Sequence, residues 1–238
     1  MNEINQLKEF VKECEHIVFF GGAGVSTESG IPDFRSVDGL YHLKYAYPPE
    51  HILSHSFFQK STEAFFQFYY DKMLYPKALP NITHQKLALL EEQGKLNAVI
   101  TQNIDGLHQL AGSRNVIELH GSVHRNYCTK CGHFYSLQEV IDKAPIPRCS
   151  CGGIIKPDVV LYEEALKEDI IEQAVNAIAA ADMLIIGGTS LSVYPAAGFI
   201  NYYSGNKLVL INKSVTPLDS EADLLITASL GEVMESLI

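Results

Sequence analysis

The sequence predicts an α/β protein with a parallel β-sheet that is covered by helices on both faces. Short apolar runs without polar alternation, such as 183–186, alternate with segments of helical character. Strands of this kind are typical of sheets buried on both faces. Glycine, hydroxyl or amide residues follow several of these runs, as expected where strands end in ligand-binding loops. Two stretches, 31–80 and 122–156, break the rhythm and are predicted insertions that together form a smaller second domain.

The expected elements follow from residue spacing. Ile4, Leu7, Val11 and Cys14 recur at helical intervals, so residues 3–15 are predicted to form an amphipathic helix. Further helices are expected near 84–93, 166–181 and 195–203 and from 231 onward, and strands at 16–20, 98–101, 116–119, 183–188, 208–212 and 224–226. The first insertion carries an aromatic-dense helical pattern between 57 and 70, which is expected to form core.

Composition excludes several classes of protein. The chain has 238 residues, 47% of them hydrophobic, and a net charge of −10. This charge argues against a general nucleic-acid or anionic-membrane surface, although it would suit a cationic partner such as a lysine-bearing peptide. No stretch approaches the roughly 18 apolar residues of a membrane span, and the start lacks the features of a signal peptide. We therefore expect a cytoplasmic, reduced protein.

The first candidate site is a glycine-rich turn at 21–30, after the first predicted strand. Glycines there allow backbone N–H groups to approach a phosphate at a helix N-terminus. The dehydrogenase pattern G-x-G-x-x-G fails, because Thr27 stands where the last glycine belongs. A tight turn without a ligand is the alternative. The polar and aromatic residues that follow, through Asp33, Phe34 and Arg35, favour a functional loop.

Two further motifs follow predicted strands. Residues 101–108 contain Asn103 and Asp105, which could bind sugar hydroxyls or a carboxamide, or could form a turn that caps the next helix. His120 follows the strand at 116–119 and could act as a general base, or could be a hydrogen-bonded structural residue. A third junction, 187–197, again joins a strand to glycines and hydroxyls, and Asn212 ends the next strand. Ligands bind at this edge of open α/β sheets, so the convergence favours one site.

Four of the five cysteines form two close pairs separated by 17 residues: Cys128, Cys131, Cys149 and Cys151. This spacing fits a tetrahedral zinc ion, although the second pair is tighter than the usual C-x-x-C. Free thiols or redox pairs are the alternatives. Four thiolates would leave no open position, so the predicted zinc is structural. Cys14, on the apolar face of the first helix, is expected to be a core residue.

Together these blocks resemble the sirtuin family of NAD-dependent protein deacylases, from about Ile17 to the C-terminus. The matching segments are 22–35 with GAGxSxxSGIPDFR, 101–108 with TQNIDGLH, His120-Gly121 with the catalytic HG, 157–160 with the peptide-facing segment, and 188–191 with GTSL. The resemblance implies a discontinuous Rossmann-type domain (1–30, 81–121 and 157–238). It also implies a cofactor loop with a helical module (31–80) and a zinc-binding module (122–156), which together form the small domain.

The resemblance also implies roles for individual residues. His120 would be the general base on a ribose hydroxyl, Asn103 a second catalytic residue, and the carbonyl of Val160 the acceptor of the acyl-lysine N–H. Leu161 and Tyr162 would contact the same peptide. Residues expected to bind NAD are Gly22, Ala23, Gly24, Thr27, Asp33, Phe34, Arg35, Gln102, Asn103, Ile104, Asp105, Gly188, Thr189, Ser190, Asn212 and Leu230.

The implied activity is NAD-dependent deacetylation of lysine, which releases nicotinamide and O-acetyl-ADP-ribose. One structural zinc, acyl-lysine protein or peptide substrates and a monomeric state are expected, with no direct nucleic-acid or membrane partner.

The run 41–44 lacks the arginine of the desuccinylating branch, so uncharged acyl groups are expected. Glu163 stands where the family usually has glycine, and with Glu164 it could form an acidic rim that attracts basic peptides. ADP-ribosyl transfer and a non-enzymatic NAD-sensing module are the competing hypotheses.

Overall fold

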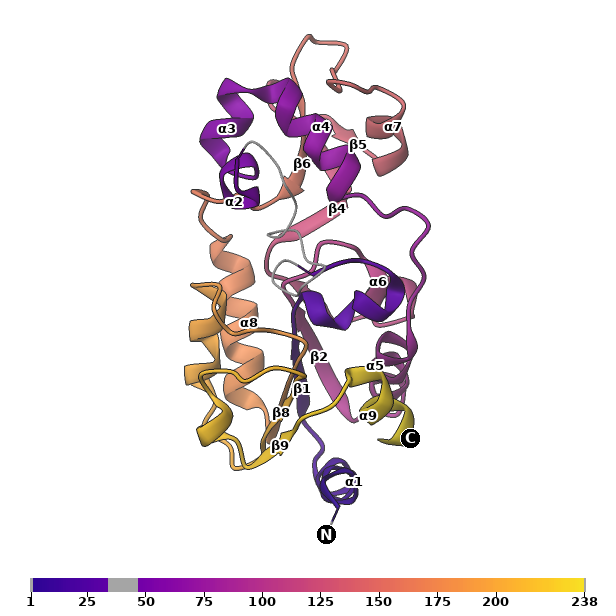
Figure 1. Cartoon of the computed structure of the whole chain (residues 1–238), viewed down its shortest axis with the longest axis vertical. Coiled ribbons are helices and arrows are strands. Elements are labelled where there is room, and N and C mark those ends of the chain that lie inside the picture. Colours follow the sequence, from indigo (N-terminus) through magenta and orange to yellow (C-terminus); the bar gives the residue numbers. More distant parts are fainter. Residues whose placement is uncertain (1, 34–46, 238) are drawn as a thin grey trace.

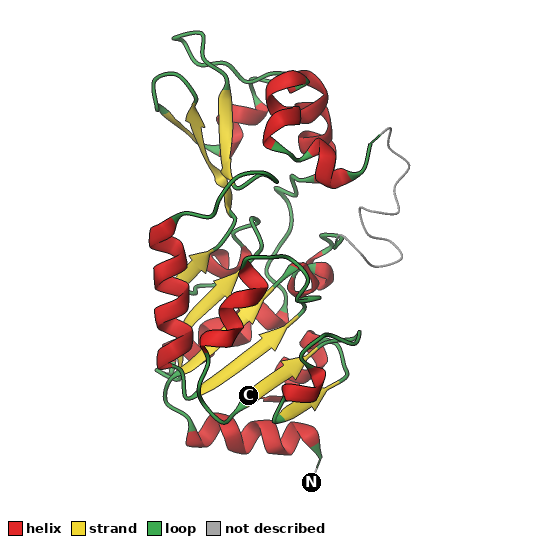
Figure 2. Cartoon of the chain, turned by 90° about the vertical axis from the view of Figure 1, so that its left-hand side faces the viewer, coloured by secondary structure: helices red, strands yellow, loops and turns green. Residues whose placement is uncertain are grey.

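The computed structural model describes residues 2–33 and 47–237, and its larger part is built on a six-stranded sheet (Figures 1 and 2). The strand order is β3-β2-β1-β7-β8-β9, and all neighbouring strands are parallel. The strands are β1 (Ile17–Gly21), β2 (Leu96–Thr101), β3 (Val116–Glu118), β7 (Met183–Gly187), β8 (Leu208–Ile211) and β9 (Leu224–Ile226). This order is that of a Rossmann-type fold, and it confirms the predicted fold class.

Each face of the large sheet has its own hydrophobic core. Alternate residues of β1 face opposite sides: Phe19 packs with helices α1 (Glu3–Glu13), α5 (Ile82–Glu92) and α9 (Leu230–Leu237). Phe20 instead packs with α8 (Glu168–Ala180) and the 3₁₀ helix η4 (Ala196–Tyr202). The strands therefore lack polar alternation because both faces are buried.

The helix expected near 195–203 is a 3₁₀ helix and not an α-helix. Gly198 lies in its middle and is a poor α-helix former. Its N–H donates to the carbonyl of Pro195, three residues back, at 2.9 Å. The segment still buries Phe199 and Ile200 against the sheet.

The smaller part lies beyond the carboxyl end of the large sheet and combines both insertions (Figure 1). Its antiparallel sheet has the order β5-β4-β6. Its elements are α2 (Pro49–Ile52), α3 (His55–Lys60), α4 (Thr62–Lys72), β4 (Gly121–Cys128), β5 (Phe134–Tyr135), α7 (Leu137–Ile141) and β6 (Ile155–Val159). Strand β6 extends past the predicted module boundary at 156, because it pairs with β4 as far as Val159.

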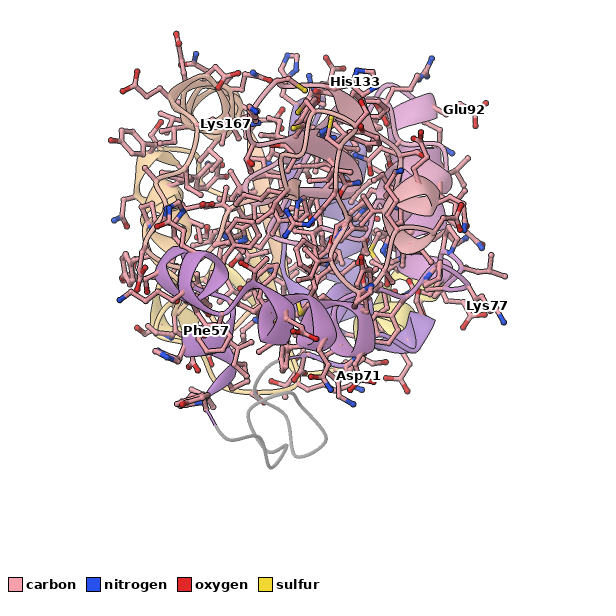
Figure 3. All side chains as sticks on the ribbon, turned by 90° about the horizontal axis from the view of Figure 1, so that it is seen from above. Phe57, Asp71, Lys77, Glu92, His133 and Lys167 are labelled. Atoms are coloured by element: carbon pink, nitrogen blue, oxygen red, sulfur yellow. The ribbon has the colours of Figure 1, made fainter. Side chains whose placement is uncertain are left out.

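The aromatic segment between 57 and 70 forms the core of this smaller part, as predicted. Phe65 and Phe66 are fully buried and pack with Val123 of β4 and Leu137 of α7. Seen from above, Phe57 and Asp71 lie on one side of the molecule and His133 of the zinc module lies on the other (Figure 3). Val123 and Leu137 thus join the zinc module to the core of the helical module, and the zinc module has a smaller core of its own around Cys128 and Val140.

Helix starts follow local capping chemistry. Asn81 accepts from the N–H groups of Thr83 and His84 in a capping box that starts α5, and Ser136 and Glu139 form another at α7. Within the described ranges, no helix has the length and apolar character that crossing a membrane requires.

Candidate active site

The carboxyl ends of β1 and β7 lie side by side at the point where the strand order reverses, and a large cavity opens there. Gly21 and Gly187 are paired at these ends, and the loops that follow them line a cavity of about 1000 Å³. Ligands bind at such a switch point in open parallel sheets. The cavity extends to the smaller part of the molecule, whose residues Leu53, Val123 and Leu161 also line it.

The two glycine loops pack directly against each other. The N–H of Gly24 donates to the carbonyl of Gly188 at 2.8 Å, and a Cβ on Gly24 would lie 2.8 Å from the Cα of Gly188. Gly188 itself has a φ of +61°, a conformation that favours glycine. Both loops must therefore lack side chains here, and they present backbone to the cavity.

A hydrogen-bonded chain joins the first glycine loop to the loop after β2. The hydroxyl of Ser26 donates to Oδ2 of Asp105 at 2.7 Å, and Nδ2 of Asn103 donates to Oγ of Ser26 at 3.1 Å. The other oxygen of Asp105 accepts from the N–H of Leu107 at 2.9 Å. Asp105 thus forms a turn at the start of α6 (Leu107–Leu110), whose N-cap is Gly106, and orients the polar groups of the cavity.

A second chain spans the switch point. Nε2 of Gln102 donates to Oγ1 of Thr189 at 3.1 Å, and the N–H of Thr189 donates to Oδ1 of Asn212 at 3.1 Å. Nδ2 of Asn212 is buried and has no partner within the described protein. Because a buried donor is costly when unpaired, this amide fits a ligand oxygen such as a ribose hydroxyl.

His120 follows β3 and faces the same cavity. Its Nδ1 lies 2.9 Å from the carbonyl oxygen of Gln102, which can only accept, so Nδ1 carries the proton. Nε2 is therefore the nitrogen with a free lone pair. Burial lowers the pKa of His120, and the bond to Gln102 opposes this in part, so the ring is neutral near pH 7. A neutral, oriented imidazole is suited to act as a general base.

Apart from the four cysteines, every described residue that was expected to bind NAD or the peptide or to act in catalysis lines this one cavity. Phe34 and Arg35, and the run Tyr41–Lys44, lie outside the described residues. Two contributors were given no role from the sequence. Ser26 stands within the glycine-rich block and could have been found there. His124, whose Nε2 lies 2.9 Å from the carbonyl of Asp105, gave no signal because it lies within a strand.

The segment after β6 is fixed on both sides. The N–H of Val160 donates to the carbonyl of His120 at 3.0 Å. Tyr162 pairs with the start of α3: its N–H donates to Leu53, and its carbonyl accepts from His55. The residues expected to contact a peptide are thus held between the base and the helical module.

The carboxylates of Glu163 and Glu164, expected to form an acidic rim for basic peptides, already bond to other groups of the protein. Glu163 adopts a φ of 74°, which explains why glycine is usual at this position, and its carboxylate accepts from the N–H and hydroxyl of Ser56. Glu164 forms an ion pair with Lys156 at 3.1 Å and a hydrogen bond with Nδ1 of His55 at 2.7 Å. The Glu164 charge is therefore already balanced within the protein.

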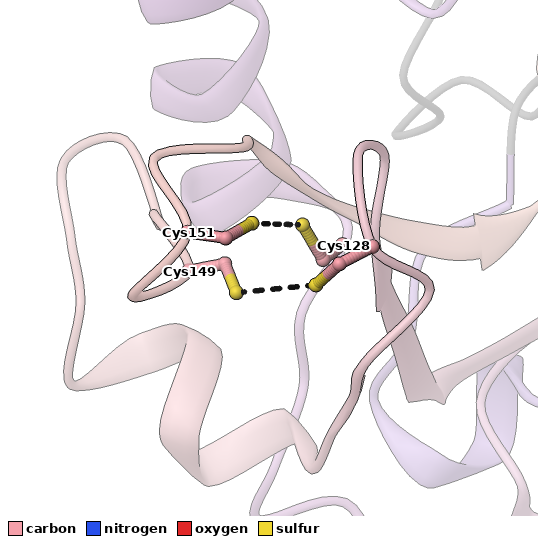
Figure 4. A group of neighbouring side chains, drawn as sticks. Cys128, Cys149 and Cys151 are labelled. Carbon is pink, nitrogen blue, oxygen red and sulfur yellow. Dashed lines mark hydrogen bonds between the residues drawn. The ribbon is translucent and has the colours of Figure 1, made fainter.

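The four predicted metal ligands come together in the zinc module (Figure 4). The Sγ atoms of Cys128, Cys131, Cys149 and Cys151 all lie within 4.8 Å of one another. The closest pairs are Cys128–Cys151 at 3.4 Å and Cys131–Cys149 at 3.6 Å. Tetrahedral zinc with Zn–S bonds of 2.3 Å needs sulfurs about 3.8 Å apart, so the cluster fits one structural zinc ion.

Comparison with known proteins agrees with this geometry. The Sir2 family model matches residues 22–195. The chain is 62% identical to an NAD-dependent protein deacetylase of Clostridium acetobutylicum, with 100% of this chain and 99% of the relative covered. It is 59% identical to one of Clostridium perfringens, with the same coverage.

Solved structures show the same fold. A Sir2 variant with a deacetylated p53 peptide and 3′-O-acetyl ADP-ribose superposes with a TM-score of 0.92 at 38% identity, covering 98% of this chain and 96% of the other. A Sir2–p53 peptide–NAD+ complex superposes with a TM-score of 0.89 at 38% identity, covering 98% and 95%. With the glycine loops, the oriented histidine and the four-cysteine cluster in place, this chain belongs to the Sir2 family.

Proposed function

We propose that this protein is an NAD-dependent protein-lysine deacetylase that releases nicotinamide and O-acetyl-ADP-ribose. The observation that carries the proposal is the position of His120. Its Nδ1 is fixed on Gln102, it faces the cavity that both glycine loops line, and its carbonyl bonds to Val160 of the peptide-facing segment. The relatives named NAD-dependent protein deacetylase support the same activity.

Different walls of the cavity are assigned to different parts of NAD. We assign the ADP-ribose part of NAD to Ala23, Gly24, Ser190 and Asn212, whose backbone or amide groups face the cavity at the sheet edge. The nicotinamide end is assigned to Asn103, Ile104 and Asp105, on the loop that Ser26 holds. When bound, NAD supplies an electrophilic ribose carbon with nicotinamide as its leaving group.

The protein's own groups then position the acyl-lysine and move a proton. The carbonyl of Val160 is assigned to accept the N–H of the acyl-lysine, which aims the acyl oxygen into the cavity. Holding both reactants aligned in a site shielded from water supplies the main rate gain. Nε2 of His120 takes the proton of a ribose hydroxyl, which is the role of a general base.

The acyl group is proposed to be uncharged. Leu53, Ile104, Val123 and Leu161 line the cavity on the side of the helical module, where they belong to one hydrophobic cluster. Burying a carboxylate against such a surface without a paired cation is unfavourable. Acetyl-lysine peptides are therefore the substrates to test first.

The test combines the protein, NAD and an acetyl-lysine peptide, with O-acetyl-ADP-ribose measured by mass spectrometry. We expect this product from the wild-type protein. His120→Ala should lower turnover by about 10²–10⁴-fold, the usual contribution of a general base, and should keep NAD affinity within a few-fold. The matched control is His16→Ala, an exposed histidine next to the start of β1, at the opposite end of the strand from the site.

Two results would contradict the proposal. If the reaction uses labelled NAD and the label becomes attached to protein while no O-acetyl-ADP-ribose forms, the activity is ADP-ribosyl transfer. Full turnover in His120→Ala would show that this imidazole is not the base.

A further inference from the structure

An ion-pair cluster lies beside the catalytic cavity and joins the two parts of the molecule. NH1 of Arg125 lies 2.7 Å from Oε2 of Glu118, and Nε of Arg125 lies 3.0 Å from Oδ2 of Asp158. Nζ of Lys167, directly before α8, lies 2.9 Å from the other oxygen of Asp158. Glu118 ends a strand of the large sheet, whereas Asp158 belongs to the small sheet.

Each of the two carboxylates lies the same number of residues before a residue with a proposed role in the reaction. Glu118 precedes His120 by two residues, and Asp158 precedes Val160 by two. Arg125 thus bridges the segment that carries the proposed base and the segment that carries the proposed acceptor of the acyl-lysine N–H. We call Arg125, Glu118 and Asp158 the arginine clamp.

A strand irregularity brings Arg125 to this place. The pairing of β4 with β6 shifts register between Ser122 and Asn126, so Arg125 lies in a bulge. Bulges redirect side chains and often occur next to active sites. The same bulge places the N–H of Val123 on the carbonyl of Ile104 at 3.0 Å.

Packing alone does not support this wall of the catalytic cavity. Glu118, Arg125 and Val160 line the main cavity, and they also line a second cavity of about 220 Å³. With a cavity on each side, this wall has fewer packed neighbours than a side chain deep in the core, although Val160 still packs against the core of the large sheet. The backbone hydrogen bond from Val160 to the carbonyl of His120 joins the two segments at one point, and the charge-assisted bonds of Arg125 add a second connection, because a planar guanidinium can bond two carboxylates at once.

The carboxylates are well suited to this task. The side chain of Glu118 is only 9% exposed and that of Asp158 15%, whereas the Arg125 side chain that joins them is 39% exposed, so the carboxylate side of each bond is the part shielded from solvent. Burial raises the pKa of Asp158, but the bonds from Lys167 and Arg125 outweigh it and hold that pKa below its ordinary value. Asp158 therefore stays charged at neutral pH.

We propose that the arginine clamp is a positioning device that, together with the backbone hydrogen bond from Val160 to His120, fixes the relative orientation of these two segments, so that Arg125 governs productive binding of the acyl-lysine peptide. This inference rests on the proposed deacetylase function. Arg125 acts here through the two segments and is not assigned to the proton transfer.

The test compares Arg125→Met and Arg125→Lys with the wild type, using an uncharged acetyl-lysine peptide. Arg125→Met removes the bridge, and lysine keeps the charge but cannot bond both carboxylates in one plane. We expect the KM for the peptide to rise about tenfold in Arg125→Met and by an intermediate factor in Arg125→Lys. The KM for NAD should stay within twofold, because the glycine loops are remote from the clamp in the sequence and share no hydrogen bond with it among the described contacts.

Controls separate positioning from stability and from charge. Arg114→Gln, which changes an exposed arginine between α6 and β3, should behave as the wild type. The triple variant Glu118→Gln, Arg125→Met, Asp158→Asn leaves no unpaired carboxylate in the clamp, and its peptide KM should remain raised. The melting temperature identifies any variant that fails to fold, and Arg125→Lys keeps the test valid in that case.

The outcomes are distinguishable. An unchanged peptide KM in both Arg125 variants would overturn the clamp, as would a normal peptide KM in the triple variant, which would attribute the effect to unpaired charge. An inactive wild-type protein would instead overturn the proposed function. A fall in kcat with an unchanged peptide KM would indicate a purely structural role and would also overturn the inference.

Discussion

Asp105 forms two hydrogen bonds that fix different parts of the loop after β2. Its position after a strand suggested either a turn that caps the next helix or a ligand-binding carboxylate. One oxygen accepts from the N–H of Leu107 in a turn at the start of α6, and the other accepts from Ser26 at the cavity wall. A carboxylate has lone pairs for several donors, so the two roles do not compete. The hydrogen bonds of Asp105 make the loop rigid as well as polar.

The environment of His120 predicts a pH dependence. Burial holds its pKa below the ordinary histidine value of about 6.5, so the base is active when unprotonated and activity should be lost as pH falls through that lowered pKa. We expect kcat to be flat between pH 7 and 8 and to decline only below about pH 6.5. Steady-state rates from pH 5 to 8 at saturating NAD and peptide provide the measurement. A half-maximal point above pH 7 would contradict the lowered pKa.

Helices α5 and α6 pack around two buried imidazoles beneath the cavity loop. His84 and His108 are 0% and 1% exposed, and their ring centroids are 4.7 Å apart. Burial lowers the pKa of His84 to about 4, opposed by Asp105. Burial, and then His84, lower the pKa of His108 to about 3. Both rings are therefore neutral in the folded protein at pH 7.

This pair makes the packing of the two helices sensitive to acid. Between pH 6.5 and 4 the unfolded chain binds protons that the folded chain does not, so stability should fall by on the order of a few kcal/mol as pH drops. His108→Leu removes one of these groups and should reduce the decline by roughly half. Urea unfolding at pH 7.0, 6.0 and 5.0 measures it, with His16→Gln as the exposed control. Equal slopes for His108→Leu and the wild type would refute this account.

At the scale of the whole molecule, the cavity belongs to neither part alone. The large sheet supplies the glycine loops and His120, whereas the smaller part supplies Leu53, Val123 and Leu161. Each face of the large sheet has a core that includes no zinc ligand. The zinc module, by contrast, packs Cys128 and Cys149 with Val140 and Ile155 in a small core of its own.

Loss of zinc should therefore abolish peptide turnover while NAD binding remains. Cys128→Ser combined with Cys131→Ser should abolish zinc binding and peptide turnover, because the small sheet loses its constraint, and should leave NAD binding largely intact. Zinc content, NAD titration and hydrogen exchange of β4 and α7 are the measurements. Cys14→Ala, which changes the fifth cysteine in the core of the large sheet, should retain one zinc per chain. Full turnover without zinc would disprove its structural role.

The sequence by itself determined the parallel α/β architecture and the group of four cysteines that fits one zinc ion. These features depend on local patterns: apolar runs of strand length, glycines after strands, and cysteine spacing. Even the edge at which the motifs meet was predictable, because parallel strands share their carboxyl ends.

Only the tertiary structure decided which side chains hold one another. The balanced charge of Glu164 and the bridge made by Arg125 depend on contacts between side chains of different elements. Arg125 gave no signal in the sequence, since a single arginine within a strand is ordinary until a bulge turns it toward two carboxylates. Local propensity predicts where the chain forms strands and turns, whereas burial and three-dimensional contact set the charge and orientation of each functional group.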